Sequence, residues 1–150
     1  MFQSSDVQEL TGLTRSQLRE WCGSDRRNIL PPDVKPRGPG KNALYHWRTV
    51  LVLRLLKQLR DEFGVELGAW AQNMRALQAH LSLIAFHALW GRNLLFSSAQ
   101  AARIIGNVPI TGEVQGLIIP LDPHLMVIAT RLQGELPPQM NLFPALAVAR

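Results

Sequence analysis

The sequence predicts a mainly α-helical fold with small β content: a helix-turn-helix head, a long helix of the dimerisation type and a small α/β C-terminal unit. Three observations predict this fold class. Two short amphipathic segments near the N-terminus are separated by a turn that contains glycine. An apolar stripe with heptad spacing then runs through the middle of the chain. Short apolar runs bounded by turn residues follow it.

The first helix of the head has an apolar side made by Val7 and Leu10. We expect Ser4 or Ser5 to cap its N-terminus, because a side-chain oxygen there accepts hydrogen bonds from free backbone N–H groups. We expect Gly12 to end it, because glycine adopts the positive φ of a helix C-cap without steric cost. A second helix can therefore begin directly after the turn.

The second helix carries the candidate DNA-reading side chains. Thr14 is a good N-cap, and Gln17 follows it with the spacing of a capping box. Leu18 and Trp21 point inward, which leaves the other positions polar. Because the second helix of this motif enters the major groove, we expect its polar side to meet DNA. The residues concerned are Thr14, Arg15, Ser16, Gln17 and Arg19.

A basic loop rich in proline and glycine follows, from Arg26 to Tyr45. Six of the residues 31–40 are Pro or Gly, which excludes a helix there. We expect Ile29–Leu30 and Ala43–Leu44 to form the two short strands of a wing, with basic side chains between them that reach the DNA backbone. Those candidates are Lys35, Arg37 and Lys41, preceded by Arg26 and Arg27, for which solvated loop charge is the alternative.

The basic charge is concentrated on this head. Residues 13–60 hold eleven Lys and Arg against three Asp and Glu, a net charge of +8. Residues 76–150 hold four against three, a net charge of +1. A surface that binds phosphates requires such a concentration. An ordinary solvated basic surface is the alternative interpretation.

Five groups of residues along the head are together similar to one known DNA-binding family. They are Thr11-Gly12-Leu13-Thr14-Arg15, Leu18-Arg19-Glu20-Trp21, Ile29-Leu30-Pro31, Arg37-Gly38-Pro39-Gly40-Lys41 and Tyr45. With these groups the head resembles the MerR-like winged helix-turn-helix domain over roughly residues 2–75. No part of the second half of the chain takes part in the resemblance.

The resemblance implies a winged head in which Arg19 and the aromatic residue at position 21 contact DNA, and in which Tyr45 opens the next helix. Here the aromatic residue is Trp21, which either contacts DNA or belongs to the core. The wing departs from the family pattern, because Ala43 stands where relatives commonly have an arginine that contacts phosphate. We therefore expect the basic loop to take over that role. The resemblance also implies that the DNA is bent or untwisted to adjust promoter geometry.

Two further helices are predicted after the loop. Residues 47–63 have helical periodicity, and Gly64 is expected to end that helix. Its buried side is expected to hold Val50, Leu53, Leu56, Leu59 and Phe63, with Val52 and Leu55 as the alternative. A long helix is expected from Leu67 to Leu89, with apolar residues at the a and d positions of three heptads. Burial of this stripe within one chain is the alternative to a dimer. The candidate dimer contact is Met74, Leu77, Leu81, Ile84 and Ala88.

The last third of the chain is expected to combine short strands and helices. Strands are predicted at Asn93–Phe96 and Leu117–Leu121. Because Pro120 lacks an N–H group, the second strand is expected either to lie at a sheet edge or to end its pairing early. Between them, the segment SSAQAARIIG is expected to form a helix capped by one of its first two serines and ended by its glycine. A final helix is expected to begin at Asp122 or Pro123 and to run through Leu132, since aspartate is a good N-cap and proline is favoured at the first helical position.

Several kinds of site are not indicated. The single cysteine, Cys22, excludes an internal disulfide and the multi-cysteine site of thiolate metal sensors. His80 and His87 are seven residues apart, hence on one face of the predicted helix, but no further ligand has a matching spacing. No nucleotide-binding loop or catalytic triad is present, so we expect neither an enzyme nor a cofactor or metal. No apolar run is long enough to cross a membrane. We therefore expect a bacterial, cytoplasmic and nucleoid-associated protein.

The leading hypothesis is a sequence-specific transcriptional regulator with a DNA-binding domain at residues 1–66, a long helix at 67–90 and a C-terminal unit at 91–150. The expected partners are double-stranded DNA, a second copy of the chain on an inverted repeat, and RNA polymerase or another protein. Two alternatives are an excisionase-like architectural protein that bends DNA, and a protein-interaction module with an accessory DNA-binding head. A small-molecule sensor is a third, although no polar cluster identifies a ligand.

Overall fold

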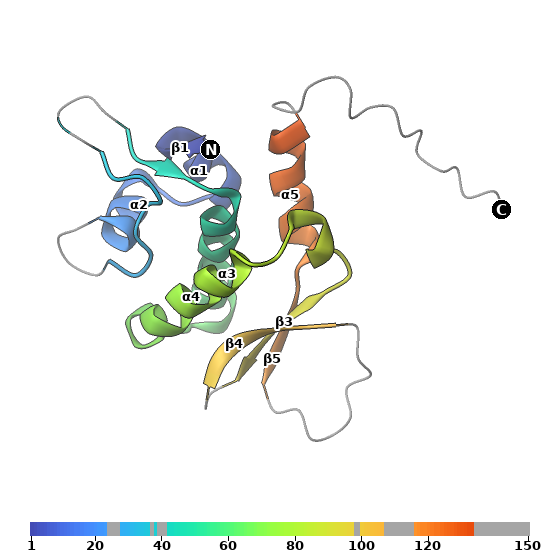
Figure 1. Ribbon diagram of the computed structural model, residues 1–150. Coiled ribbons are helices and arrows are strands. Elements are labelled where there is room, and N and C mark those ends of the chain that lie inside the picture. Colours follow the sequence, from blue (N-terminus) through green and yellow to red (C-terminus); the bar gives the residue numbers. More distant parts are fainter. Residues whose placement is uncertain (24–27, 37, 39–41, 98–99, 107–115, 134–150) are drawn as a thin grey trace.

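The computed structural model describes residues 1–23, 28–36, 38, 42–97, 100–106 and 116–133. It is mainly α-helical with small β content, as predicted (Figure 1). The head holds β1 (Phe2–Gln3), α1 (Ser4–Thr11), α2 (Arg15–Cys22), β2 (Leu44–Tyr45) and α3 (Trp47–Phe63). After it come α4 (Leu67–Leu81), the 3-10 helix η1 (Phe86–Leu89), β3 (Asn93–Ser97), β4 (Gln100–Ile105), β5 (Leu117–Pro120) and α5 (Asp122–Gln133).

A short antiparallel sheet, β1 with β2, ties the N-terminus to the segment before α3. Because β1 runs straight into α1, the N-cap of α1 is Gln3. The backbone N–H of Gln3 donates to the Asp6 carboxylate over 2.9 Å, and the two residues form a capping box. The predicted caps, Ser4 and Ser5, are therefore wrong, since both serines already lie inside the helix.

The predicted wing strand at Ile29–Leu30 is also wrong. Both side chains are fully buried in the head, and two prolines follow at once. Those prolines have no N–H groups with which to continue a ladder. The strand contact forms further along the loop, where Val34 and Leu44 exchange two backbone hydrogen bonds of 3.1 Å. Only the Leu44 part of the prediction is confirmed.

The central helix of the molecule is α3, which is buried on every side from Thr49 to Leu53 and becomes exposed in its last turn. It packs against α1 of the head, against α4 and against α5. Gly64 ends it in the left-handed conformation with φ 63°, as predicted. Phe63 is 48% exposed in this last turn, so its predicted burial is wrong. The residues of α3 with an exposed fraction of 0% are Thr49, Val50, Leu51, Val52, Leu53, Leu56 and Leu59.

The helix α4 ends at Leu81 and not at the predicted Leu89. Beyond its end the chain turns back toward the head, and the Phe86 ring of η1 packs edge-on against Trp47 with centroids 5.0 Å apart. Leu89 is fully buried by the same turn. These contacts within the chain compete with a straight continuation of the helix and end it early. His80 and His87 therefore do not share a helix.

The predicted dimer seam is covered inside the chain along α4. Met74, Leu77 and Leu81 have exposed fractions of 0%, 2% and 1% in a single protomer. Ile84 and Ala88 lie beyond the end of α4 and are half-buried. The heptad stripe thus belongs to the core of one chain along the whole of α4. The contact of Ile84 and Ala88 with a second copy stays a prediction.

The C-terminal sheet is antiparallel, with the strand order β4-β3-β5. Strand β4 occupies most of SSAQAARIIG, so the helix predicted there is wrong. Ile104 pairs with Leu94 and Ile105 with Asn93, and this pairing outweighs the helix preference of the alanines. The strands predicted for β3 and β5 are confirmed, and Pro120 does lie on an edge strand. On one face of the sheet, Phe96 stacks on Trp70 of α4 with ring centroids 3.9 Å apart.

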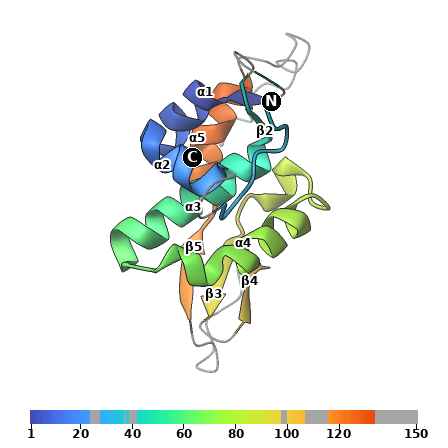
Figure 2. The ribbon, with the colours of Figure 1, turned by 90° about the vertical axis from the view of Figure 1, so that its left-hand side faces the viewer.

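The last helix, α5, begins at Asp122 as predicted and packs back on the head (Figures 1 and 2). His124 Nε2 lies 2.9 Å from Gln58 Oε1 of α3. The Arg131 guanidinium lies 2.8 Å from the Asp6 carboxylate of α1, and this hydrogen bond lowers the pKa of Asp6. The head and the C-terminal segment therefore share one hydrophobic core across the predicted boundaries.

This docking of α5 predicts a sensitivity to acid. Burial lowers the pKa of His124 from 6.5 to about 4, with the nearby Arg54 charge as a second cause. Between pH 6.5 and 4 the unfolded chain therefore binds a proton at His124 that the folded chain does not. We expect this group alone to lower the free energy of unfolding by roughly 2 kcal/mol between pH 7.5 and 5, measured by urea denaturation.

The His124→Gln variant is expected to lose this component of the pH dependence. The matched control is His80→Gln, because His80 is exposed on α4. The control should retain the pH dependence of the unsubstituted chain. An unchanged pH profile in His124→Gln would contradict the assignment.

Candidate nucleic-acid interface

The N-terminus of α2 is built as the sequence predicts. The Thr14 hydroxyl accepts a hydrogen bond of 3.2 Å from the Gln17 N–H, and the Gln17 side-chain oxygen accepts one of 2.9 Å from the Thr14 N–H. The preceding turn depends on Gly12, which has φ 69° and ends α1. The predicted capping box and helix-ending glycine are both confirmed. They fix the angle at which α2 leaves the core.

The two sides of α2 differ sharply in polarity. Leu18 and Trp21 are buried against the head, with exposed fractions of 4% and 1%. Trp21 is therefore a core residue, and the Arg60 guanidinium lies 5.7 Å from the centroid of its ring. The opposite side is polar and faces solvent at Thr14, Arg15, Ser16 and Arg19, while Gln17 is half-buried.

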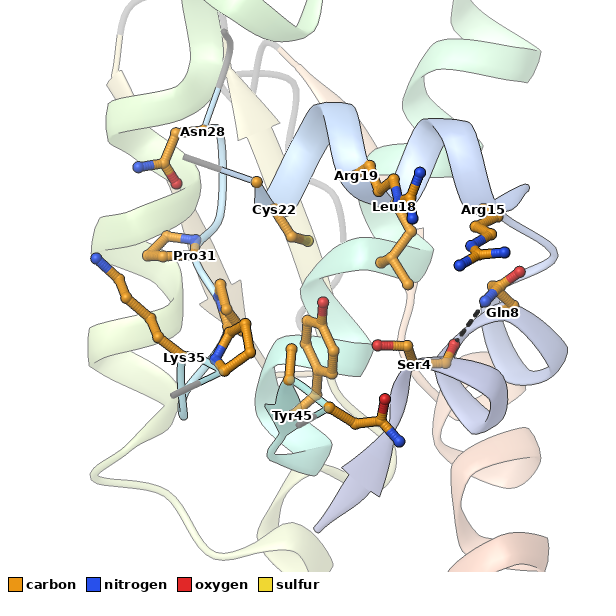
Figure 3. A pocket seen from close by; sticks show the side chains of 15 residues that line it. Ser4, Gln8, Arg15, Leu18, Arg19, Cys22, Asn28, Pro31, Lys35 and Tyr45 are labelled. Carbon is orange, nitrogen blue, oxygen red and sulfur yellow. Dashed lines mark hydrogen bonds between the residues drawn. The ribbon is translucent and has the colours of Figure 1, made fainter. Parts of the chain in front are cut away.

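A groove of about 480 Å³ lies beside the exposed side of α2 (Figure 3). Arg15 and Arg19 line it from α2, and Lys35 lines it from the loop on the other side. No acidic residue is among the described residues that line it. The other described residues of the walls are mixed: Ser4, Gln8, Asn28 and Asn42 are polar, and Leu18, Pro31, Pro32, Pro36 and Ala43 are apolar. The groove is thus positively charged and rich in hydrogen-bonding groups, as a site for phosphates or nucleic acid requires.

The floor of the groove is neutral. Tyr45, a predicted DNA-binding residue, is only 3% exposed and its side chain hydrogen-bonds with those of Ser4 and Cys22. Burial raises the pKa of Tyr45 to about 12 and that of the Cys22 thiol to about 12. Both groups are therefore protonated near neutral pH. The charge of the groove comes from the cations on its walls.

Sequence reasoning missed two residues that shape this groove. Asp33 lies beside Lys35 in sequence, but its carboxylate turns to the N-terminus of α3 and not into the groove. Arg75 of α4 donates hydrogen bonds to the carbonyl oxygens of Asn28 and Ile29. No local pattern could reveal the second contact, because 46 and 47 residues separate the partners.

Four of the predicted DNA-binding residues, Arg26, Arg27, Arg37 and Lys41, lie outside the described residues. Within the part of the chain that the structure describes, no three His, Cys, Asp or Glu side chains gather in a group that could hold a metal ion. None of the helices in that part is long and apolar enough to span a membrane.

The family described as MerR HTH family regulatory protein matches residues 2–77, which is half of the chain. The chain belongs to this family. It is accordingly a DNA-binding transcription regulator, and the groove beside α2 lies within the matched region. No curated protein matches the chain. The part of this MerR-family regulator after residue 77, which includes the C-terminal sheet and α5, lies outside the match.

The capping box of α2 gives a direct test of how this interface is built. Replacement Thr14→Ala removes the hydroxyl that holds the Gln17 N–H. We expect a loss of about 1 kcal/mol in the free energy of unfolding, measured by chemical denaturation. The control Thr14→Ser keeps an oxygen at the same position and should retain most of the stability. Equal stabilities of the two variants would contradict the role of the cap.

Proposed function

We propose that this MerR-family protein is a sequence-specific transcriptional regulator that binds double-stranded DNA with α2 in the major groove. The observation that carries the proposal is the cationic groove, which has Arg15 and Arg19 on one wall and Lys35 on the other. The position of α2 supports it, because a rigid apolar side holds the helix while its polar side stays free.

Base recognition is assigned to the polar side of α2. A guanidinium group pairs with O6 and N7 of guanine in a bidentate manner, which suits Arg15 and Arg19. The amide of Gln17 suits N6 and N7 of adenine, although its capping bonds with Thr14 limit its freedom. The hydroxyl of Ser16 and the exposed edge of Thr14 suit phosphate oxygens.

Contacts with the DNA backbone are assigned to the loop on the other side of the groove. Lys35 is exposed there. Its ammonium group can bind a phosphate oxygen from several directions, because such a contact does not require one fixed geometry. Arg26, Arg27, Arg37 and Lys41 are proposed as further backbone contacts on the basis of charge alone. Tyr45 and Trp21 are proposed to support the interface from below, since both are buried.

We propose further that two copies bind an inverted repeat. One α2 reads only a few base pairs, and a two-fold pair of such helices spans successive major grooves about 34 Å apart. The contact between the copies would lie outside the buried seam of Met74, Leu77 and Leu81. Recruitment of RNA polymerase or another protein and distortion of the promoter DNA belong to the same proposal, on the resemblance to the family.

Selection of random-sequence duplexes by the purified full chain tests the proposal. We expect an inverted repeat to be enriched. Arg15→Ala and Arg19→Ala should each relax the preference at one position of each half-site and weaken binding by roughly ten- to a hundredfold. The control is Arg92→Ala, because Arg92 is exposed but does not line the groove.

The alternatives give different results in the same experiment. Salt-sensitive binding without an enriched sequence would favour the architectural protein and contradict the sequence-specific regulator. Absence of any DNA binding at low salt would contradict both and favour the protein-interaction module. Enrichment of a single half-site would contradict only the homodimer.

A further inference from the structure

The loop wall of the groove, residues 28–36, is held by few backbone contacts of its own. The Leu30 N–H donates to the carbonyl of Trp21, and Val34 pairs with Leu44. Asn28 has φ 33°, a conformation that is uncommon for residues other than glycine, although asparagine adopts it more often than most. Other groups must therefore fix this wall if Lys35 is to face α2 across the groove.

One such group is Arg75 of α4, which holds the start of the wall. Its Nε donates a hydrogen bond of 3.1 Å to the carbonyl of Ile29, and its Nη2 donates to the carbonyl of Asn28. The fixed fork of a guanidinium suits two successive carbonyls. Arg75 thus restrains the backbone at the position where the chain departs from ordinary geometry.

A second group, Gln78 of the same helix, holds the middle of the wall through two further side chains. Gln78 Nε2 donates a hydrogen bond of 2.7 Å to Thr49 Oγ1, and Thr49 Oγ1 donates one of 2.6 Å to Asp33 Oδ2. The same Asp33 oxygen accepts a hydrogen bond of 2.7 Å from the His46 N–H, at the N-terminus of α3. The Thr49 hydroxyl in the middle of this chain is fully buried, whereas Asp33 is exposed and Gln78 is half-buried. A carboxylate at the N-terminus of a helix is also favoured by the helix dipole.

We propose that Arg75 and Gln78 are positioning residues for DNA binding: they hold the loop wall of the groove at its start and its middle without touching the DNA. They are three residues apart on α4 and therefore lie on one side of that helix. The position of α4 is in turn fixed by the stack of Trp70 on Phe96 of the C-terminal sheet. The inference rests on the proposed function, because it assigns Lys35 and its neighbours to the DNA backbone.

Thr49 offers the sharpest test. Thr49→Val keeps the shape of the buried side chain but removes the hydroxyl, which breaks the link from Gln78 to Asp33. Thr49→Ser keeps the hydroxyl and is the matched rescue variant. The first readout is hydrogen exchange of the His46 and Val34 amides in the free full chain. We expect exchange about tenfold faster in Thr49→Val than in the unsubstituted chain, and near the unsubstituted rate in Thr49→Ser.

DNA binding gives the second readout. Thr49→Val should bind DNA several-fold more weakly. The negative slope of log affinity against log salt should become shallower by about one for each lost phosphate contact. The base preferences set by α2 should stay unchanged. Thr49→Ser should recover both the affinity and the salt slope, because it restores the hydroxyl that links Gln78 to Asp33.

Arg75→Met tests the other anchor, and Arg75 is exposed enough for the chain to tolerate the change. It should speed exchange of the Leu30 amide and leave the His46 amide unchanged. If Thr49→Val fails to fold, Gln78→Met is the substitute, because Gln78 is only half-buried. It removes the hydrogen bond from Gln78 to Thr49 and so breaks the same link. Unchanged exchange in these variants would overturn the inference. If the unsubstituted chain binds no DNA, the proposed function fails, while the exchange result still decides whether the wall is held in this way.

Discussion

Burial of α3 on every side between Thr49 and Leu53 is the constraint on which the rest of the structure depends. A helix at the surface of a domain needs one apolar stripe, whereas α3 is apolar on several sides and must be covered by several elements. Burial of each of its leucine and valine side chains stabilises the fold by about 1.5–3 kcal/mol. The helices α1, α4 and α5 supply the cover, and they come from both halves of the chain. The C-terminal segment is therefore part of the core on which the DNA-binding head is built.

Polar groups of α3 and its neighbours determine how these elements are aligned. Arg54 donates a hydrogen bond to the carbonyl of Leu10 near the end of α1, and burial lowers the pKa of this arginine. Gln58 lies against His124 of α5, and Thr49 links α3 to α4 and to the loop. Buried polar contacts of this kind are costly when incomplete, so they favour one arrangement over others. The groove beside α2 inherits its shape from that arrangement.

The sequence was sufficient where the signals are local. Thr14 and Gln17 specify the start of α2 through bonds between residues three apart, and Gly12 specifies the turn before it. The strand β4 was not predictable, because an alanine-rich segment suits a helix until β3 offers it partners. The stripe of α4 shows a related limit: periodicity predicts that Met74 is buried, but not whether the same chain or a second copy covers it. The contacts of Asp33 and Arg75 join distant segments and leave no trace in the local pattern.

The central claim is that DNA meets the polar side of α2. A photoreactive amino acid at position 16, on the exposed side of α2, tests it most directly when the protein is irradiated with random-sequence duplexes at low and moderate salt. The matched position is 130 on α5, which is also exposed but does not line the groove. The account predicts a covalent DNA adduct from position 16 and none from position 130. Adducts of equal yield from both positions, or from position 130 alone, would contradict it.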